Sequence, residues 1–148
     1  MQVGVKYRAI AFSVDGVPKG QPRPMATARN GKARVYDPGT AESWKAQIAF
    51  AIRPYLPPEP IDGPLYVSVV FLMPRPKRLL TKSSPDGLVP HTAKPDCDNL
   101  AKALYDCLTQ TGVWHDDAQI VYARVQKYYC EKNGSPGASI VIDEWRND

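Results

Sequence analysis

Apolar and polar residues alternate in three stretches of the chain, and this alternation predicts three β-strands. The stretches are residues 6–14 (KYRAIAFSV), 118–129 (AQIVYARVQKYY) and 137–145 (GASIVIDEW), all rich in β-branched and aromatic side chains. A fourth stretch, residues 65–73 (LYVSVVFLM), becomes apolar on both faces towards its end. Two apolar faces are typical of a strand at the centre of a sheet, so we expect residues 65–73 to lie there.

Two Asn-Gly pairs predict tight turns between strands. Asn30-Gly31 predicts a short hairpin that pairs residues near 25–29 with residues 33–36. Asn133-Gly134 lies in the loop EKNGSPG between the last two predicted strands. We therefore expect these last two strands to form a second hairpin.

Two stretches with a helical spacing of apolar residues predict the main helices. The first covers residues 40–53 and ends there because Pro54 disfavours the helical conformation of the residue before it. The second covers residues 98–108, and Gly112 is a suitable glycine for its C-terminal cap. The apolar stripes consist of Trp44, Ile48, Ala51 and Ile52 in the first helix and of Leu100, Ala103, Leu104, Cys107 and Leu108 in the second.

The length of the chain limits the architecture to one domain. With 148 residues it can bury one core but not two, so we predict a single domain over residues 1–148. In this domain a small β-sheet packs with two main helices. No apolar run approaches the ~20 residues that span a bilayer, and the N-terminus lacks the pattern of a signal peptide. We expect no contact with a membrane.

The cysteines favour a reducing compartment. Cys97, Cys107 and Cys130 are an odd number without framework spacing, which is typical of reduced thiols in a cytoplasmic protein. The alternative is a zinc site that combines these thiols with His91 or His115. It is disfavoured because the chain has no CxxC or HxxxH pairing.

Basic residues gather in two loop regions, and the net charge of the chain is +4. One region covers residues 19–34. The other is a long basic loop, residues 74–95, with five prolines and no regular periodicity. Loops this long in a small domain are usually functional or disordered, and an excess of positive charge is compatible with binding a polyanion. We predict DNA contacts for Lys19, Arg23, Arg29, Lys32, Arg34, Arg75, Lys77 and Arg78.

Four carboxylates and one lysine are grouped around the second predicted helix. Asp96 and Asp98 precede or open it, Asp116 and Asp117 follow it, and Lys102 lies one turn after Asp98. Carboxylate oxygens suit Mg²⁺ or Mn²⁺, and crowded carboxylates repel one another unless a cation neutralises them. Attack of a metal-activated water on a phosphodiester is the reaction that this set would serve best.

Ordinary structural roles are the alternative for the same residues. Asp98 can be only an N-cap, and an exposed Asp98–Lys102 ion pair would contribute only ~0.3–0.5 kcal/mol. Asp106 can pair with Lys102 in the same way, and Asp116-Asp117 can be an acidic turn.

Three motifs follow one another in this part of the chain. They are Asp96-Cys97-Asp98-Asn99-Leu100-x-Lys102-Ala103-Leu104-x-Asp106, then residues 112–120 (GVWHDDAQI), then Arg124-Val125-x-Lys127. Together, from about Lys94 to Lys127, they resemble the RusA family of Holliday-junction resolvases, which phages and prophages often carry. The upstream segments PKGQPRP and VYDPGTAESW resemble phage-type members more loosely.

This resemblance implies a mixed α/β (α+β) fold and a homodimer with one active site per subunit. It implies a Mg²⁺-dependent endonuclease that resolves four-way DNA junctions by paired, symmetric nicks with 5′-phosphate ends. It also implies that Asp96, Asp98 and Asp117 bind the metal and that Lys102 is catalytic. Asp116 belongs to the motif without being a principal ligand. Cys97 departs from the aliphatic residue that is usual between the two aspartates.

Other function classes remain as alternatives. A general structure-specific nuclease would also cut flaps or forks, and a non-catalytic protein would bind junctions without nicking them. A nucleotide-sugar transferase with a DxD motif fits less well, because the chain is short and has no Gly-rich turn that could cradle phosphates.

Overall fold

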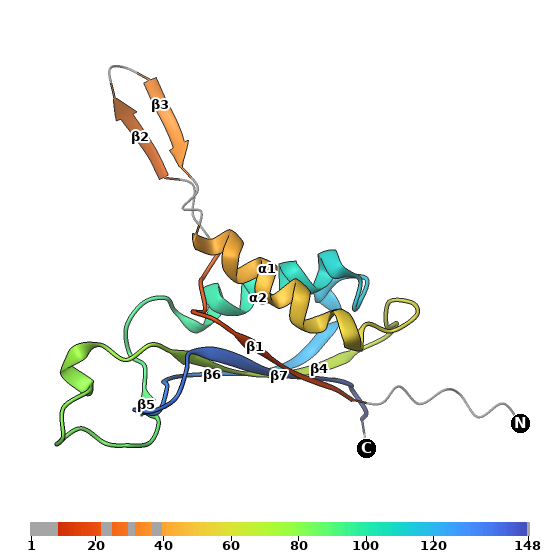
Figure 1. The fold of residues 1–148 in the computed structure, drawn as a ribbon. Helices are drawn as coiled ribbons and strands as arrows, with labels where there is room; N and C mark the ends of the chain where they lie inside the picture. Colours follow the sequence, from red (N-terminus) through yellow and green to blue (C-terminus); the bar gives the residue numbers. More distant parts are fainter. Residues whose placement is uncertain (1–8, 22–24, 30–31, 37–39, 148) are drawn as a thin grey trace, which may run out of the picture.

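The computed structural model describes residues 9–21, 25–29, 32–36 and 40–147 (Figure 1). Two α-helices, α1 (Thr40–Ile52) and α2 (Cys97–Thr111), accompany the strands. Three short 3-10 turns are η1 (Arg53–Tyr55), η2 (Lys77–Leu79) and η3 (Asp117–Gln119). The strands are β1 (Ile10–Asp15), β2 (Met25–Arg29), β3 (Lys32–Tyr36), β4 (Leu65–Met73), β5 (Val89–Pro90), β6 (Ile120–Tyr129) and β7 (Gly137–Glu144).

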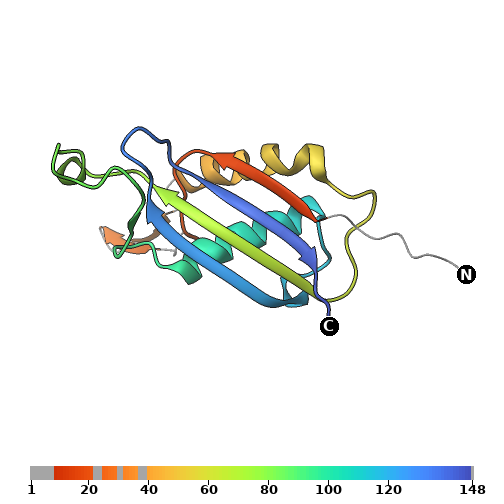
Figure 2. The same cartoon turned by 90° about the horizontal axis from the view of Figure 1, so that it is seen from below.

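Five strands form one mixed sheet in the order β1-β7-β4-β6-β5. The predicted central position of residues 65–73 is confirmed, because β4 pairs antiparallel with β7 and parallel with β6. Its residues alternate between buried and half-buried, so only one of its faces is fully buried. Figure 2 shows the reason: both helices lie behind the sheet in that view, and the other face of the sheet is open.

The second predicted hairpin is wrong. The strands β6 and β7 follow one another in the sequence, but β4 lies between them and pairs with both. The Asn133-Gly134 turn therefore leads the chain across β4 instead of joining adjacent strands. A local turn signal cannot reveal this, because the strand inserted between the two comes from a distant part of the chain. The hairpin predicted at Asn30-Gly31 is confirmed as the pair β2–β3, which forms a separate two-stranded sheet (Figure 1).

The two predicted helices cover the same face of the sheet and form the core with it (Figure 1). The exposed fraction is 2% or less for Trp44, Ile48 and Ile52 of α1 and zero for Leu100, Leu104 and Leu108 of α2. Both predicted apolar stripes thus point into the core. Because β4 and β6 are parallel, a crossover must join them, and α2 is part of that crossover.

A glycine and an aspartate cap the two ends of α2, as predicted, but the capping aspartate is Asp96 and not Asp98. Gly112 caps the C-terminus with a φ of 87°, in the left-handed region that glycine adopts without strain. At the N-terminus the cap is Asp96, whose Oδ1 accepts a hydrogen bond of 2.8 Å from the Asn99 N–H. The alternative that Asp98 is only an N-cap is therefore wrong, because Asp98 lies inside the first turn.

Within the long basic loop, η2 and the short edge strand β5 are regular, and Arg75 holds the loop together. Its guanidinium donates hydrogen bonds to five backbone carbonyls, including Cys130 O at 2.6 Å and Pro85 O at 2.8 Å. The neighbouring Lys77 and Arg78 are exposed. The guanidinium group of Arg75 thus binds carbonyl groups of its own chain, and its contact with DNA stays a prediction.

Replacing Arg75 should loosen this loop. Arg75→Met removes the donors and leaves several carbonyls without a protein partner, so we expect faster proteolysis between residues 77 and 88. Limited digestion with trypsin, followed by mass spectrometry, measures the rate at Lys77, Arg78 and Lys82. Arg78→Ala is the control, and it should leave the digestion at Lys82 unchanged. Equal digestion rates for Arg75→Met and the unsubstituted protein would contradict this role.

Among the residues that the structure describes, no helix is long and apolar enough to cross a membrane.

Candidate metal and nucleic-acid site

Three of the predicted site residues line one pocket of about 480 Å³ on the helix-covered side of the sheet. Asp98 and Lys102 lie one turn apart on α2, and Asp117 comes from η3 after the chain has returned. The remaining lining residues include Tyr105 of α2 and Val125 of β6. The tertiary fold thus brings acidic residues from separate parts of the chain to one cavity.

The first and fourth residues of the DDAQ segment, Asp116 and Gln119, fix the position of Asp117. Asp116 Oδ1 accepts a hydrogen bond of 2.9 Å from the Ala118 N–H, which caps η3. Gln119 Oε1 accepts from the backbone N–H groups of His115 and Asp116, and its Nε2 donates to Ile61 O at 2.8 Å. These contacts give Asp116 and Gln119 structural roles that leave the carboxylate of Asp117 available to the pocket.

The surroundings of Asp117 disfavour its negative charge. Burial is the largest cause that raises the pKa of this carboxyl group, followed by hydrogen bonding and charge repulsion from Asp116 and by the charge of Asp106. Only Lys102 acts in the opposite direction. Burial, together with the charge of Asp117, also raises the pKa of the Tyr105 hydroxyl. A cation at this position would relieve the repulsion.

Asp96 does not line this pocket. Its side chain is exposed and caps α2, although it lies only two residues before Asp98. In the described part of the chain, no three or more His, Cys, Asp or Glu side chains are grouped closely enough to hold a metal ion. The hard oxygen donors of Asp98 and Asp117 nevertheless fit a divalent cation such as Mg²⁺. The role of Asp96 as a further ligand stays a prediction.

The ion pairs with Asp98 and Asp106, which were the structural alternative for Lys102, are absent among the described residues. Asp106 instead lines a neighbouring pocket of about 240 Å³ together with Asp117, Gln21 and Lys45. Sequence reasoning treated Asp106 as an ordinary surface residue. Its helical spacing from Asp98 and Lys102 was the signal that could have placed it beside the site.

Lys127 of β6 holds the segment that precedes Asp96 in place. Its Nζ donates hydrogen bonds of 2.6 Å to Ala93 O and 2.8 Å to Pro95 O, the carbonyls just before Asp96. Lys127 was part of the resemblance without an assigned role. These contacts anchor the segment that leads into α2 to the central sheet.

The predicted DNA-binding residues lie in several separate places. Arg29, Lys32 and Arg34 lie on β2 and β3, Lys19 lies between β1 and β2, and Arg23 lies outside the described residues. Lys77 and Arg78 are exposed on η2. Their contacts with DNA stay predictions.

The cysteines do not form the alternative zinc site in the described structure. Cys107 donates a hydrogen bond to Lys45 O, and its pKa is raised chiefly by burial, which favours the thiol over the thiolate that zinc needs. His115 pairs with Asp62 at 2.6 Å instead of with a cysteine.

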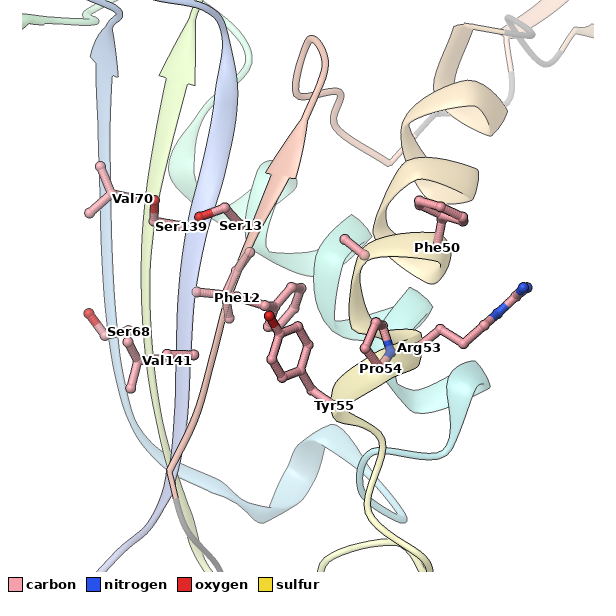
Figure 3. Close-up of a pocket in the computed structure, with 13 residues that line it drawn as sticks. Phe12, Ser13, Phe50, Arg53, Pro54, Tyr55, Ser68, Val70, Ser139 and Val141 are labelled. Carbon is pink, nitrogen blue, oxygen red and sulfur yellow. The ribbon is translucent and has the colours of Figure 1, made fainter.

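A larger hollow of about 710 Å³ lies around the edge strand β1, beside α1 and η1 (Figure 3). Its lining includes Phe12, Tyr55, Ser68 and Val141, and no carboxylate belongs to it. This hollow therefore lacks the donors of a metal site.

Because the charge of Asp117 is disfavoured in the folded protein, removing it should stabilise the fold. Above the raised pKa, ionised Asp117 destabilises the folded protein relative to the unfolded chain. Below the ordinary pKa of 3.8, Asp117 is protonated in both the folded and the unfolded protein, and this destabilisation disappears. We expect Asp117→Asn to raise Tm at pH 7, by a small amount because solvent screens the charge of a side chain that is only half-buried. Thermal melts without divalent metal at pH 7 and pH 3.5 measure this gain. A gain that persists at pH 3.5 would contradict this cause.

Comparisons with known proteins identify relatives over most of the chain. A family model described as endodeoxyribonuclease RusA matches residues 15–143. The chain is 33% identical to the uncharacterized protein YqaN of Bacillus subtilis (strain 168) over 140 residues, which cover 91% of this chain and 96% of YqaN.

Two named enzymes match a shorter part of the chain. They are the crossover junction endodeoxyribonucleases RusA of Escherichia coli (strain K12) and of Enterobacteria phage 82. Each is 48% identical over 60 residues, which cover 40% of this chain and 48% of the enzyme. The matched part thus spans about half the length of these enzymes, whereas the family model covers most of the chain. The chain belongs to the RusA endodeoxyribonuclease family.

Proposed function

We propose that the chain is a metal-dependent endodeoxyribonuclease that resolves four-way DNA junctions by paired, symmetric nicks. The observation that carries this proposal is the meeting of Asp98, Lys102 and Asp117 in one pocket of a chain from this family. The names of the enzymes that share 48% identity over 60 residues support the junction as substrate.

In this proposal Asp98 and Asp117, with Asp96 beside them, hold Mg²⁺, and Mn²⁺ can replace it. A divalent cation held by these carboxylates would supply an activated water and would polarise the scissile phosphate. The ammonium group of Lys102, on the same wall of the pocket as Asp98, stabilises the negative charge that develops on the phosphate. Hydrolysis that leaves 5′-phosphate and 3′-hydroxyl ends gives nicks that a ligase can seal.

Two-fold symmetry is the second part of the proposal. A four-way junction has two-fold symmetry, so a homodimer with two identical pockets suits paired nicks. The basic residues on β2, β3 and η2 would meet backbone phosphates, so binding should weaken steeply as salt increases. Sedimentation with and without a junction measures the oligomeric state.

A panel of labelled substrates tests the function. A four-way junction, a flap, a fork and a linear duplex are incubated with Mg²⁺, with Mn²⁺ or with EDTA. We expect metal-dependent, symmetric nicks in the junction that ligase reseals. Equal cutting of flaps or forks would indicate a general structure-specific nuclease. Binding of the junction without nicking in either metal would indicate a non-catalytic junction-binding protein.

A further inference from the structure

The segment of residues 17–21, which follows β1, contacts both helices beside the candidate site. Lys19 lines a cavity with Ser43, Trp44 and Gln47 of α1. Gln21 lines the pocket that contains Asp106 and Asp117. In Figure 1 this part of the chain runs from the end of β1 towards the start of α1. The segment is therefore placed to fix the metal-binding end of α2 against the rest of the fold.

Asn99 joins this segment to Asp96. Its backbone N–H donates to Asp96 Oδ1 at 2.8 Å, and its backbone carbonyl accepts from the Gln21 N–H at 3.4 Å. Asn99 is also flanked by Asp98. A displacement of Asn99 would thus move Asp96 and Asp98, the two residues before it that are predicted to hold the metal.

The side chain of Asn99 packs directly on Gly20, and a larger residue at position 20 would require this side chain to move. A Cβ atom at position 20 would lie 2.2 Å from Asn99 Nδ2 and 2.8 Å from Asn99 Cγ. These distances are shorter than Cβ atoms tolerate, so either the segment or Asn99 would have to shift. The φ of Gly20 lies outside the left-handed region, so the close approach of the Asn99 side chain, and not the backbone conformation, favours glycine here.

We propose that Gly20 and Asn99 form a positioning pair that holds Asp96 and Asp98 in the arrangement that binds a divalent metal. In this proposal neither residue contacts the metal or the DNA. The pair acts through the backbone of Asn99, on which the capping hydrogen bond of Asp96 depends. This inference rests on the proposed function, because it concerns the same metal site.

A double-mutant cycle tests the pair. Gly20→Ala should displace Asn99 and weaken Mn²⁺ affinity about 10–100-fold, the range typical when residues that support metal ligands are changed. Asn99→Ala removes both clashing atoms and leaves the Asn99 Cβ at 3.4 Å, an ordinary contact. The double variant Gly20→Ala/Asn99→Ala should therefore bind Mn²⁺ no more weakly than Asn99→Ala alone. Gly87→Ala is the control, because a Cβ at position 87 meets nothing within 4 Å.

Titration calorimetry with Mn²⁺ in the absence of DNA is the primary measurement, and single-turnover cleavage of the junction is the second. The inference is overturned by wild-type affinity in Gly20→Ala or by losses that simply add in the double variant. If Gly20→Ala does not fold, the Mn²⁺ affinity of Asn99→Ala is the test instead. An affinity equal to that of the wild type then overturns the inference. Failure of the wild type to bind Mn²⁺ also overturns it. Intact Mn²⁺ binding without junction cleavage refutes only the proposed substrate.

Discussion

Asp117→Asn should reduce Mg²⁺-dependent nicking of a four-way junction by at least about 10³-fold, equivalent to about 4 kcal/mol of transition-state stabilisation. The amide that replaces the carboxylate is a weaker ligand for a hard cation. It also removes the negative charge that, beside Asp98 and Asp106, favours a cation in this pocket. Junction binding should stay within a few-fold of the wild type, because phosphate contacts of basic residues are unchanged.

Single-turnover nicking and junction binding are measured on the same preparation of Asp117→Asn. Asp62→Asn is the matched control, since Asp62 is an exposed aspartate that pairs with His115 outside the pocket. The control should nick at the wild-type rate. Nicking by Asp117→Asn near that rate would remove Asp117 from the site, and a parallel loss of junction binding would indicate a role in DNA contact instead.

The second large effect is expected for Lys102→Ala, with a loss of about 10²–10³-fold in the single-turnover rate. The described structure gives the Lys102 ammonium group no salt bridge to Asp98 or Asp106, although both lie one turn away on α2. Its charge is therefore available to a phosphate in the pocket. Mn²⁺ affinity should not fall, since removing a cation does not weaken binding of a second cation.

Calorimetry with Mn²⁺ and quenched-flow cleavage distinguish this role from metal binding. The control is Lys82→Ala, which removes an exposed lysine of the long basic loop without changing the pocket. An unimpaired cleavage rate in Lys102→Ala would exclude catalysis by this lysine. A rate loss accompanied by weaker Mn²⁺ binding would indicate that Lys102 supports the metal ligands instead.

Sequence periodicity predicted the elements well because each one carries its own local signal. The alternation in residues 65–73 reflects a strand that packs on helices with one face, and Pro54 and Gly112 mark the ends of the two helices. Asp98 and Lys102 were predicted to share a helix face, and they line the same pocket. These features depend on residues close together in the chain.

Which side chains carry the chemistry stays a prediction from the motif residues, and several of their spatial relations depend on contacts between different elements. The insertion of β4 between β6 and β7 and the packing of Gly20 on Asn99 join residues far apart in the chain, and the approach of Asp106 to Asp117 joins α2 to η3. The cap of α2 by Asp96 is local, yet two aspartates of the same motif were equally suitable for it. Periodicity and capping rules describe one element at a time. The arrangement of elements comes from burying their apolar faces together, and that fixes which polar groups meet at the edge of the core.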